Sequence, residues 1–299
     1  MTTRRFFLLK NLSLLFKVRI ANIFMLVLSM YLSAVFLFDE KLEIINSLKN
    51  IKLHGIVISS TFSAMAGYII NYFYDKDKDR IYRPISTVLQ RFINDKSSLN
   101  FYIAFNIISL TVALFLSYRI FIFFLVYHFF IWFYSHKLSR IVIINNITCS
   151  ILMTFPFLAL FLFYENYAPY ILFLALFLFI IILIRDICKD LHSSKYDALF
   201  GYKTLPNTLG IGITKMFLDI LLFLLALISV RLTLLPHLQE IRLYYMLSAF
   251  LSLFMMVEIW FMEKRLTQLF ILMIKFWIFI GTISLLFIDG NPLPLYFQK

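Results

Sequence analysis

The stretch that decides the fold runs from residue 53 to residue 84 and reads LHGIVISSTFSAMAGYII followed by NYFYDKDKDRIYRP. Its first part is almost entirely apolar and is about as long as the hydrocarbon core of a bilayer requires of a helix. Its second part, which begins at Asn71, carries three aspartates, two lysines and two arginines. The pattern predicts a membrane-spanning helix that leads directly into a charged site at the membrane surface.

The composition of the whole chain agrees with a membrane protein. Of its 299 residues, 62% are hydrophobic and only 15% are charged, which is too little polar surface for a large soluble α-helical protein. Apolar runs of about 20 residues recur along the full length, and backbone groups in lipid must be satisfied within the segment, so we read these runs as helices. Nine spans are expected, near residues 17–38, 54–74, 98–117, 119–135, 141–163, 168–186, 212–231, 242–262 and 267–288.

The chain shows no linker or low-complexity segment, so residues 1–299 are expected to form a single membrane domain. Residues 1–16 have a charged and then apolar character without a small-residue cleavage site. We interpret them as an interfacial helix rather than a signal peptide. Cys149 and Cys188 form no metal-binding pattern and no evident disulfide framework.

The net charge of +12 raises the question of a nucleic-acid partner. The basic residues, however, lie in short connections between apolar runs, so membrane topology explains them better and no nucleic-acid partner is expected. With nine spans, twenty of the 28 Lys and Arg residues fall on one side. The expected fold is therefore an all-α integral membrane bundle of nine transmembrane helices in the cell inner membrane. Its N-terminus and two acidic loops face the cytoplasm.

The first acidic loop places three oxygen donors at a spacing of four residues. On a helix, Asn71, Asp75 and Asp79 would share one stripe, whereas Asp77 would point elsewhere. Carboxylates gathered on one face repel each other unless a cation lies among them, and hard oxygen ligands with room for water suit Mg²⁺. The alternative interpretation is a solvated, charged end of a helix.

The second acidic loop, IRDICKDLHSSKYDALFGYKTLP (residues 184–206), repeats the arrangement on the same side of the membrane. Asp186, Asp190 and Asp197 would share one helical face. Carboxylates beside many lysines and arginines, on two loops at one end of a bundle, suit a polyanion that is bridged by metal ions. A diphosphate is the natural candidate for that polyanion.

These two loops resemble the signatures of the UbiA-type family of intramembrane prenyltransferases, and the resemblance extends over nearly the whole chain. The second loop looks most like the geranylgeranylglycerol-phosphate geranylgeranyltransferase branch. The segments YSHKLSR (residues 134–140) and KVRIAN (residues 17–22) also resemble family segments. The residues that match the two acidic signatures are Asn71, Asp75, Asp79, Arg83 and Pro84, and then Lys189, Asp190, Asp197, Gly201, Thr204, Leu205 and Pro206.

The resemblance implies an Mg²⁺-dependent prenyltransferase. Such an enzyme transfers a geranylgeranyl, farnesyl or longer chain from its diphosphate to a lipid or an aromatic quinone precursor in the membrane. Asn71, Asp75, Asp79, Asp190 and Asp197 would then hold Mg²⁺. The diphosphate contacts would come from Arg83, Lys137 and Lys203, although each can instead be a loop charge that follows the positive-inside rule. Tyr134 and Ser135 would lie near the reacting carbon. Asn22 would orient the acceptor, with a helix cap or an interhelical contact as its alternative role.

Two positions depart from the family pattern and keep other functions open. Tyr72 and Ser193 stand where the family usually has Asp, so each acidic loop lacks one carboxylate. A catalytically impaired protein that only binds prenyl lipids is therefore one alternative. A multi-span transporter is another, although the acidic groups lie at loops on one face rather than at the midplane.

Overall fold

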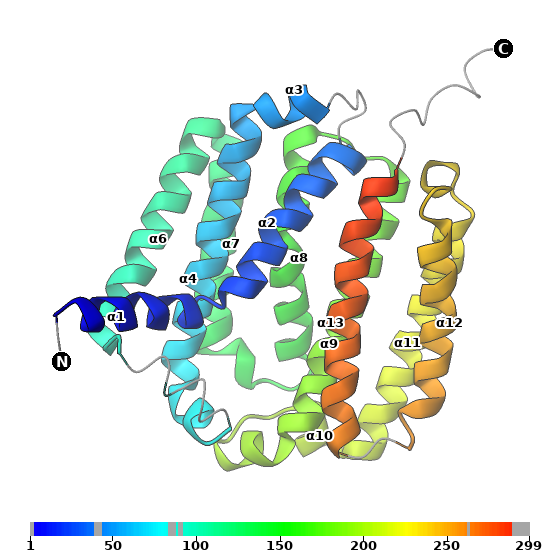
Figure 1. The fold of residues 1–299 in the computed structure, drawn as a ribbon. Helices are drawn as coiled ribbons and strands as arrows, with labels where there is room; N and C mark the ends of the chain where they lie inside the picture. The colour runs from blue at the N-terminus through cyan, green and yellow to red at the C-terminus, as the bar shows by residue number, and fades with distance from the viewer. Residues whose placement is uncertain (1–2, 39–43, 83–87, 89–91, 262–263, 289–299) are drawn as a thin grey trace.

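The computed structural model describes residues 3–38, 44–82, 88, 92–261 and 264–288, and within these ranges the chain is helical and contains no strand. Most of the helices stand side by side in one bundle (Figure 1). The main helices are α1 (Thr3–Lys17), α2 (Ile20–Ser33), α3 (Ile44–Lys49), α4 (Ile51–Tyr82), α6 (Asp95–Leu116), α7 (Tyr118–His136), α8 (Ile144–Tyr164), α9 (Pro169–Leu199), α10 (Leu205–Thr208), α11 (Ile211–Thr233), α12 (Arg242–Glu258) and α13 (Lys264–Ser284).

The expectation of an all-α membrane bundle is confirmed. The described part of the chain contains eight helices that are long and apolar enough to cross a membrane. They correspond to eight of the nine expected spans, the first being α2 together with a π-helical turn at Ala34–Phe38. The remaining span, expected near residues 242–262, corresponds to α12, which has 17 residues and packs beside α11.

The two acidic segments, expected from the sequence as loops, are helical in the structure. α4 has 32 residues and α9 has 31. At 1.5 Å of rise per residue each helix is roughly 45 Å long, which exceeds a hydrocarbon core of about 30 Å. The charged ends of α4 and α9 therefore continue beyond the apolar layer as rigid helix, and this rigidity fixes the direction of their carboxylates.

α1 lies across the bundle rather than along it (Figure 1). Its last residue, Lys17, is buried and fastens α1 to the start of α6. The Lys17 ammonium donates to the Ile93 carbonyl at 2.9 Å and to Ser98 Oγ at 2.7 Å. It also lies 4.6 Å from the centre of the Tyr72 ring. Tyr72 therefore has a packing role in place of the carboxylate usual in the family.

Polar contacts join the helices inside the apolar layer. Ser63 on α4, Ser109 on α6 and His128 on α7 are all buried. The two hydroxyl oxygens are 2.9 Å apart, and His128 Nε2 lies 3.1 Å from each of them. Such contacts between buried polar groups help to hold helices together where lipid offers no other hydrogen-bond partner.

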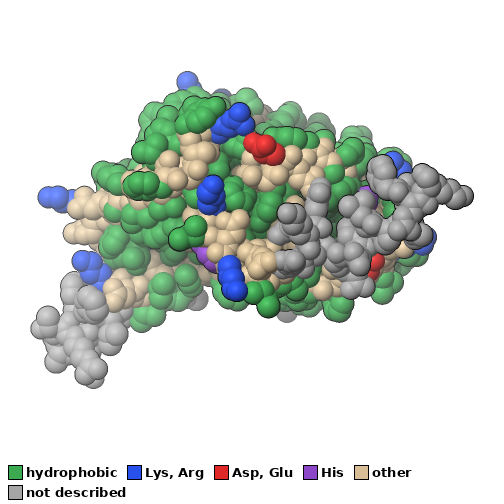
Figure 2. All heavy atoms as spheres, turned by 90° about the horizontal axis from the view of Figure 1, so that it is seen from above, with side chains coloured by type: hydrophobic (Ala, Val, Ile, Leu, Met, Phe, Trp, Pro, Cys, Tyr) green, Lys and Arg blue, Asp and Glu red, His purple; other side chains and the backbone are tan. Residues whose placement is uncertain are grey.

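The outer surface has the character expected of a lipid-facing bundle. Many large apolar side chains are exposed, including Phe115 and Phe250. The end of the bundle opposite the acidic segments also shows mainly hydrophobic side chains with scattered basic groups (Figure 2). Exposed apolar surface on this scale is unfavourable in water but favourable in lipid.

Candidate functional site

The first acidic segment lies on the last turns of α4. The Asn71 amide donates to Asp75 Oδ2 at 3.1 Å, and Asn71, Asp75 and Asp79 are all partly buried. Asp77 points away from this stripe, as expected from the spacing. It is exposed and pairs loosely with Arg80 at 3.6 Å, an arrangement that contributes little in water.

The second acidic segment lies on α9 and is more deeply buried. Asp186, Asp190 and Asp197 are at most 9% exposed. The Asn146 amide, near the start of α8, donates to Asp186 Oδ2 at 2.9 Å and to Asp190 Oδ2 at 2.8 Å. Asn145 donates to the same oxygen of Asp190 at 3.2 Å. Buried carboxylates are costly without hydrogen bonds, so these two amides make the acidic face of α9 possible.

Ser193 also serves the second acidic segment, although it lacks a carboxylate. Its hydroxyl donates to Asp197 Oδ2 at 2.5 Å and to the carbonyl of Lys189 at 3.0 Å. A Ser hydroxyl has one proton, so the two contacts share it. The residue therefore supports a neighbouring carboxylate where a further ligand was expected from the family pattern.

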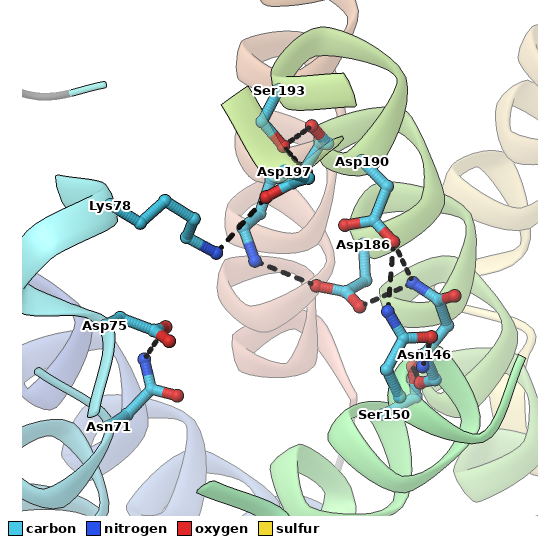
Figure 3. Close-up of polar contacts among 11 residues, drawn as sticks. Asn71, Asp75, Lys78, Asn146, Ser150, Asp186, Asp190, Ser193 and Asp197 are labelled. Atoms are coloured by element: carbon cyan, nitrogen blue, oxygen red, sulfur yellow. Dashed lines mark hydrogen bonds and ion pairs between the residues drawn. The ribbon is translucent and has the colours of Figure 1, made fainter. Parts of the chain in front are cut away.

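The two acidic segments converge at one end of the bundle. The Lys78 ammonium on α4 lies 3.2 Å from Asp197 Oδ1 on α9, and the Tyr202 hydroxyl, just beyond α9, donates to Asp75 Oδ1. Figure 3 shows Asn71 and Asp75 facing Asp186 and Asp197 across the space between α4 and α9. Residues from segments more than a hundred positions apart in the sequence thus form one charged site. We call this site the mouth; it is bordered by Asn71, Asp75 and Lys78 on α4 and by Asp186, Asp190, Asp197 and Tyr202 on or just after α9.

Tyr202 is the residue that links the two segments most directly. Gly201 adopts φ +71°, a left-handed conformation that glycine accepts without strain. The turn there lets the Tyr202 backbone N–H donate to the Asp197 carbonyl at 2.9 Å. Burial, followed by the neighbouring Asp75 carboxylate, raises the pKa of the Tyr202 phenol well above its ordinary value. The phenol therefore stays protonated and remains a donor to Asp75.

The oxygen donors of this mouth suit Mg²⁺ in one particular mode of binding. Within the described ranges, no three His, Cys, Asp or Glu side chains lie close enough together to hold an ion by themselves. An ion bound here would take one or two carboxylates from the protein and its other ligands from water and a bound anion. Mg²⁺ is commonly held in this way where phosphate oxygens supply ligands.

The family of the chain follows from a comparison with known proteins. The model of the UbiA prenyltransferase family matches residues 43–280, which include both acidic segments. The chain belongs to the UbiA prenyltransferase family.

Curated relatives in this UbiA family carry the name digeranylgeranylglyceryl phosphate synthase. The protein from Korarchaeum cryptofilum is 28% identical over 191 residues, which are 63% of this chain and 66% of the relative. The protein from Saccharolobus solfataricus is 30% identical over 185 residues, which are 61% of this chain and 64% of the relative. The matched segment thus spans less than two thirds of each relative's own length.

Solved structures of UbiA proteins share the fold over nearly the whole chain. A UbiA homologue from Archaeoglobus fulgidus bound to GPP and Mg²⁺ superposes with a TM-score of 0.68 at 17% identity, covering 91% of this chain and 99% of the homologue. A structure described as digeranylgeranylglyceryl phosphate synthase in membranes gives a TM-score of 0.65 at 21% identity, covering 94% and 98%. These likenesses establish the UbiA fold of the chain.

The other residues expected at this UbiA site, as far as the structure describes them, lie in different settings. Ser135 is buried and Tyr134 is partly buried on the last turn of α7, whereas Lys137 and Lys203 are exposed. Asn22 donates to the Tyr68 hydroxyl at 3.2 Å, which is the interhelical contact considered for it as an alternative. Arg83, together with Pro84, lies outside the described residues.

Sequence reasoning gave no individual role to several residues that the fold brings into the mouth, although it counted Lys78 among the bases beside the first acidic stripe. Asn145 and Asn146 follow an apolar run, and they do not lie three or four residues from a residue of another motif. Arg140 and Lys78 look like the basic residues that are common in cytoplasmic connections. Tyr202 lies between two residues of the family motif. A pair of adjacent Asn residues at the start of a membrane span was the one available signal, because an amide there needs a partner.

Proposed function

We propose that this chain is an Mg²⁺-dependent prenyltransferase that moves a prenyl group from its allylic diphosphate to an acceptor within the membrane and releases diphosphate. The single observation that carries the proposal is the convergence of two acidic, base-rich helix ends at one mouth of a membrane bundle. Lys78 and Tyr202 bridge those ends. Membership of the UbiA family supports the same reaction.

The proposed reaction breaks the bond between C1 of the prenyl chain and the diphosphate oxygen, and the electron pair leaves with the diphosphate. An acceptor atom then forms a bond to C1 and loses its proton. Bound Mg²⁺ would supply positive charge that stabilises the departing diphosphate. Asn71, Asp75 and Asp79 on α4 would hold the ion, and Asp190 on α9 would add a carboxylate from across the mouth. Asp197, the further ligand expected on α9, has both of its oxygens engaged, by Lys78 and by Ser193.

The remaining site residues have proposed roles that follow from the resemblance to the family. Lys137, Lys203 and Arg83 would add positive charge for the diphosphate. Tyr134 and Ser135 at the end of α7 would line the apolar side, where an aromatic face stabilises the allylic cation and a dry wall keeps water from it. Asn22 would orient the acceptor through its amide.

A glyceryl phosphate lipid is the acceptor class that we propose, with a geranylgeranyl diphosphate donor. The support is the name shared by the curated relatives, digeranylgeranylglyceryl phosphate synthase. An aromatic quinone precursor is the competing acceptor class, and a farnesyl or longer diphosphate is the competing donor.

The experiment that tests the proposal uses the purified full chain in lipid nanodiscs with Mg²⁺ and labelled geranylgeranyl or farnesyl diphosphate. Geranylgeranylglyceryl phosphate, dihydroxynaphthoate and hydroxybenzoate are supplied separately, and products are identified by mass spectrometry. A prenylated glyceryl phosphate with equimolar diphosphate is expected. Binding without turnover would indicate the impaired prenyl-lipid binder. Uptake of the uncleaved diphosphate into sealed proteoliposomes that contain the chain would indicate a transporter.

A further inference from the structure

Lys78 occupies an unusual position for a lysine that follows a membrane span. Its side chain is only 14% exposed and reaches from α4 to Asp197 on α9, whose side chain is 3% exposed (Figure 3). The ammonium also lies 4.0 Å from the centre of the Tyr202 ring. Lys76, two residues earlier on the same helix, makes the contrasting contact. It pairs with Asp95 in a setting where the side chains are 30% and 52% exposed.

The buried Lys78–Asp197 ion pair is not explained by its contribution to stability alone. Removing both charges from water costs several kcal/mol, and their attraction often does no more than offset that cost. Such a pair is weak evidence for stability alone. A buried ammonium with one carboxylate partner and one aromatic neighbour has donors left for a third group.

The third group that fits is an anion in the mouth between the helices. Lys78 Nζ lies in the space that separates Asp75 from Asp197, as Figure 3 shows. Arg140, from the connection after α7, lies 5.3 Å from the centre of the same Tyr202 ring. Two cations thus border a single aromatic ring at the point where the two acidic helix ends meet.

Both oxygens of Asp197 are already engaged. Oδ1 pairs with Lys78 at 3.2 Å, and Oδ2 accepts the Ser193 hydroxyl at 2.5 Å. Asp197 is therefore arranged to fix an ammonium rather than to present open oxygens to a divalent ion. By contrast, Asp75 receives donors that carry no net charge, from Asn71 and Tyr202, so its negative charge is not neutralised by them.

We propose that Lys78 is a diphosphate-binding residue whose ammonium is fixed by Asp197 and by the Tyr202 ring. Its positive charge would bind the diphosphate on the α9 side of the mouth, and a metal ion would bind it on the α4 side. This inference rests on the proposed function, because it names the group that binds the diphosphate of that reaction. Tyr202 is a positioning residue in this arrangement: its ring supports Lys78 while its hydroxyl holds Asp75.

The test measures binding of inorganic diphosphate to the purified full chain in detergent by calorimetry, with and without Mg²⁺. Lys78→Met keeps the length of the side chain and removes its charge, and Lys76→Met is the matched control that breaks an ion pair on the same helix. Loss of a charge-assisted hydrogen bond predicts that Lys78→Met binds diphosphate about ten- to a hundredfold more weakly. Lys76→Met should bind it like the unmodified chain, and Lys78→Arg should restore most of the affinity.

A second measurement separates diphosphate recognition from damage to the fold. Thermal unfolding is recorded for each variant, and Lys78→Gln replaces Lys78→Met if the latter does not fold. Binding of the uncharged prenyl alcohol geranylgeraniol should be unchanged in the Lys78 variants, because it has no diphosphate.

The outcomes distinguish this inference from the proposed function. If the unmodified chain binds neither diphosphate nor prenyl diphosphate in the presence of Mg²⁺, the proposed function fails and this inference fails with it. If it binds diphosphate and Lys78→Met binds equally well, only the role of Lys78 is overturned. An equal loss in Lys76→Met and Lys78→Met would likewise overturn it, because general surface charge would then explain the effect.

Discussion

At the scale of single residues, the chemistry of the site depends on the partner of each carboxylate. Some carboxylates accept hydrogen bonds from uncharged groups, and others form ion pairs with cations. Asp75 accepts hydrogen bonds from an amide and a phenol, whereas Asp197 is paired with an ammonium. Two carboxylates on neighbouring helices are thereby prepared for different partners. The first keeps a charge that can attract a metal ion, and the second holds a fixed cation.

Asp75→Asn tests the metal role while leaving the shape of the side chain unchanged. We expect turnover to fall by about a hundredfold or more, which is typical of removing one electrostatic group from a catalytic site. The matched control is Asp77→Asn on the same helix, because Asp77 is exposed and pairs with the exposed Arg80. Steady-state kinetics at several Mg²⁺ concentrations would show the difference, and equal rates for the two variants would contradict the assignment.

The Asn pair at the start of α8 gives a second comparison between adjacent residues. Asn146 donates to two buried carboxylates, and Asn145 donates to one of them at a longer distance. Asn146→Ala should therefore cost about 2–4 kcal/mol of stability, because it leaves buried charge without its donor. Asn145→Ala should cost less. Thermal unfolding in detergent checks this order, and a reversed order would refute it.

At the scale of elements, the long helices α4 and α9 turn a sequence spacing into a fixed geometry. Because each continues as helix beyond the apolar layer, its carboxylates point in directions set by 100° per residue. α1 adds a brace at this end of the bundle, since Lys17 contacts the Ile93 carbonyl and Ser98. The position of α1 is thus coupled to the charge state of one buried lysine.

The Lys17 contacts that hold α1 to the start of α6 should make the free energy of unfolding depend on pH. Burial lowers the pKa of Lys17 from 10.5 to about 8, so the folded chain binds fewer protons than the unfolded chain between those two values. Stability should then rise as pH increases from about 8 to 10.5, by roughly 3 kcal/mol at most. Thermal unfolding of the unmodified chain and of Lys17→Met over this range isolates the effect, because other groups titrate equally in both. Parallel curves would contradict it.

At the scale of the whole molecule, the distribution of bases predicts which end faces the cytoplasm. In the expected topology, most of the Lys and Arg residues fall on the side that holds the two acidic segments. The opposite end shows scattered basic side chains (Figure 2). A cytoplasmic mouth would open to the compartment where soluble diphosphates and Mg²⁺ are available.

Cysteine labelling tests this orientation directly. Asp77, in the last turns of α4, and Glu165, directly after α8, are both exposed, at 68% and 63%. α4 and α8 finish at opposite ends of the bundle (Figure 1). In a background with Cys149 and Cys188 replaced by Ser, a membrane-impermeant thiol reagent should label Glu165→Cys in intact cells. It should label Asp77→Cys only after permeabilisation. The opposite pattern would show that the mouth faces outward.

The sequence by itself determined the membrane class, the positions of the spans and the two acidic stripes. Apolar length and helical spacing are local properties, so residues 53–79 alone place Asn71, Asp75 and Asp79 on one face at the end of a span. The same reasoning placed Asp186, Asp190 and Asp197 on α9. The distribution of bases placed both stripes on one side of the membrane, and the family signature supported the expectation that they act together.

Only the tertiary structure decided which partners each carboxylate receives. Lys78 pairs with Asp197, Tyr202 with Asp75, and Asn146 with Asp186 and Asp190. All of these contacts join residues on different helices or connections. Taken alone in the sequence, Lys78, Tyr202 and Asn146 look like ordinary charged or polar residues with no specific role. Their roles depend on how α4, α8 and α9 rotate and pack against each other. That rotation is fixed by the summed contacts of the whole bundle, which no local spacing in the sequence encodes.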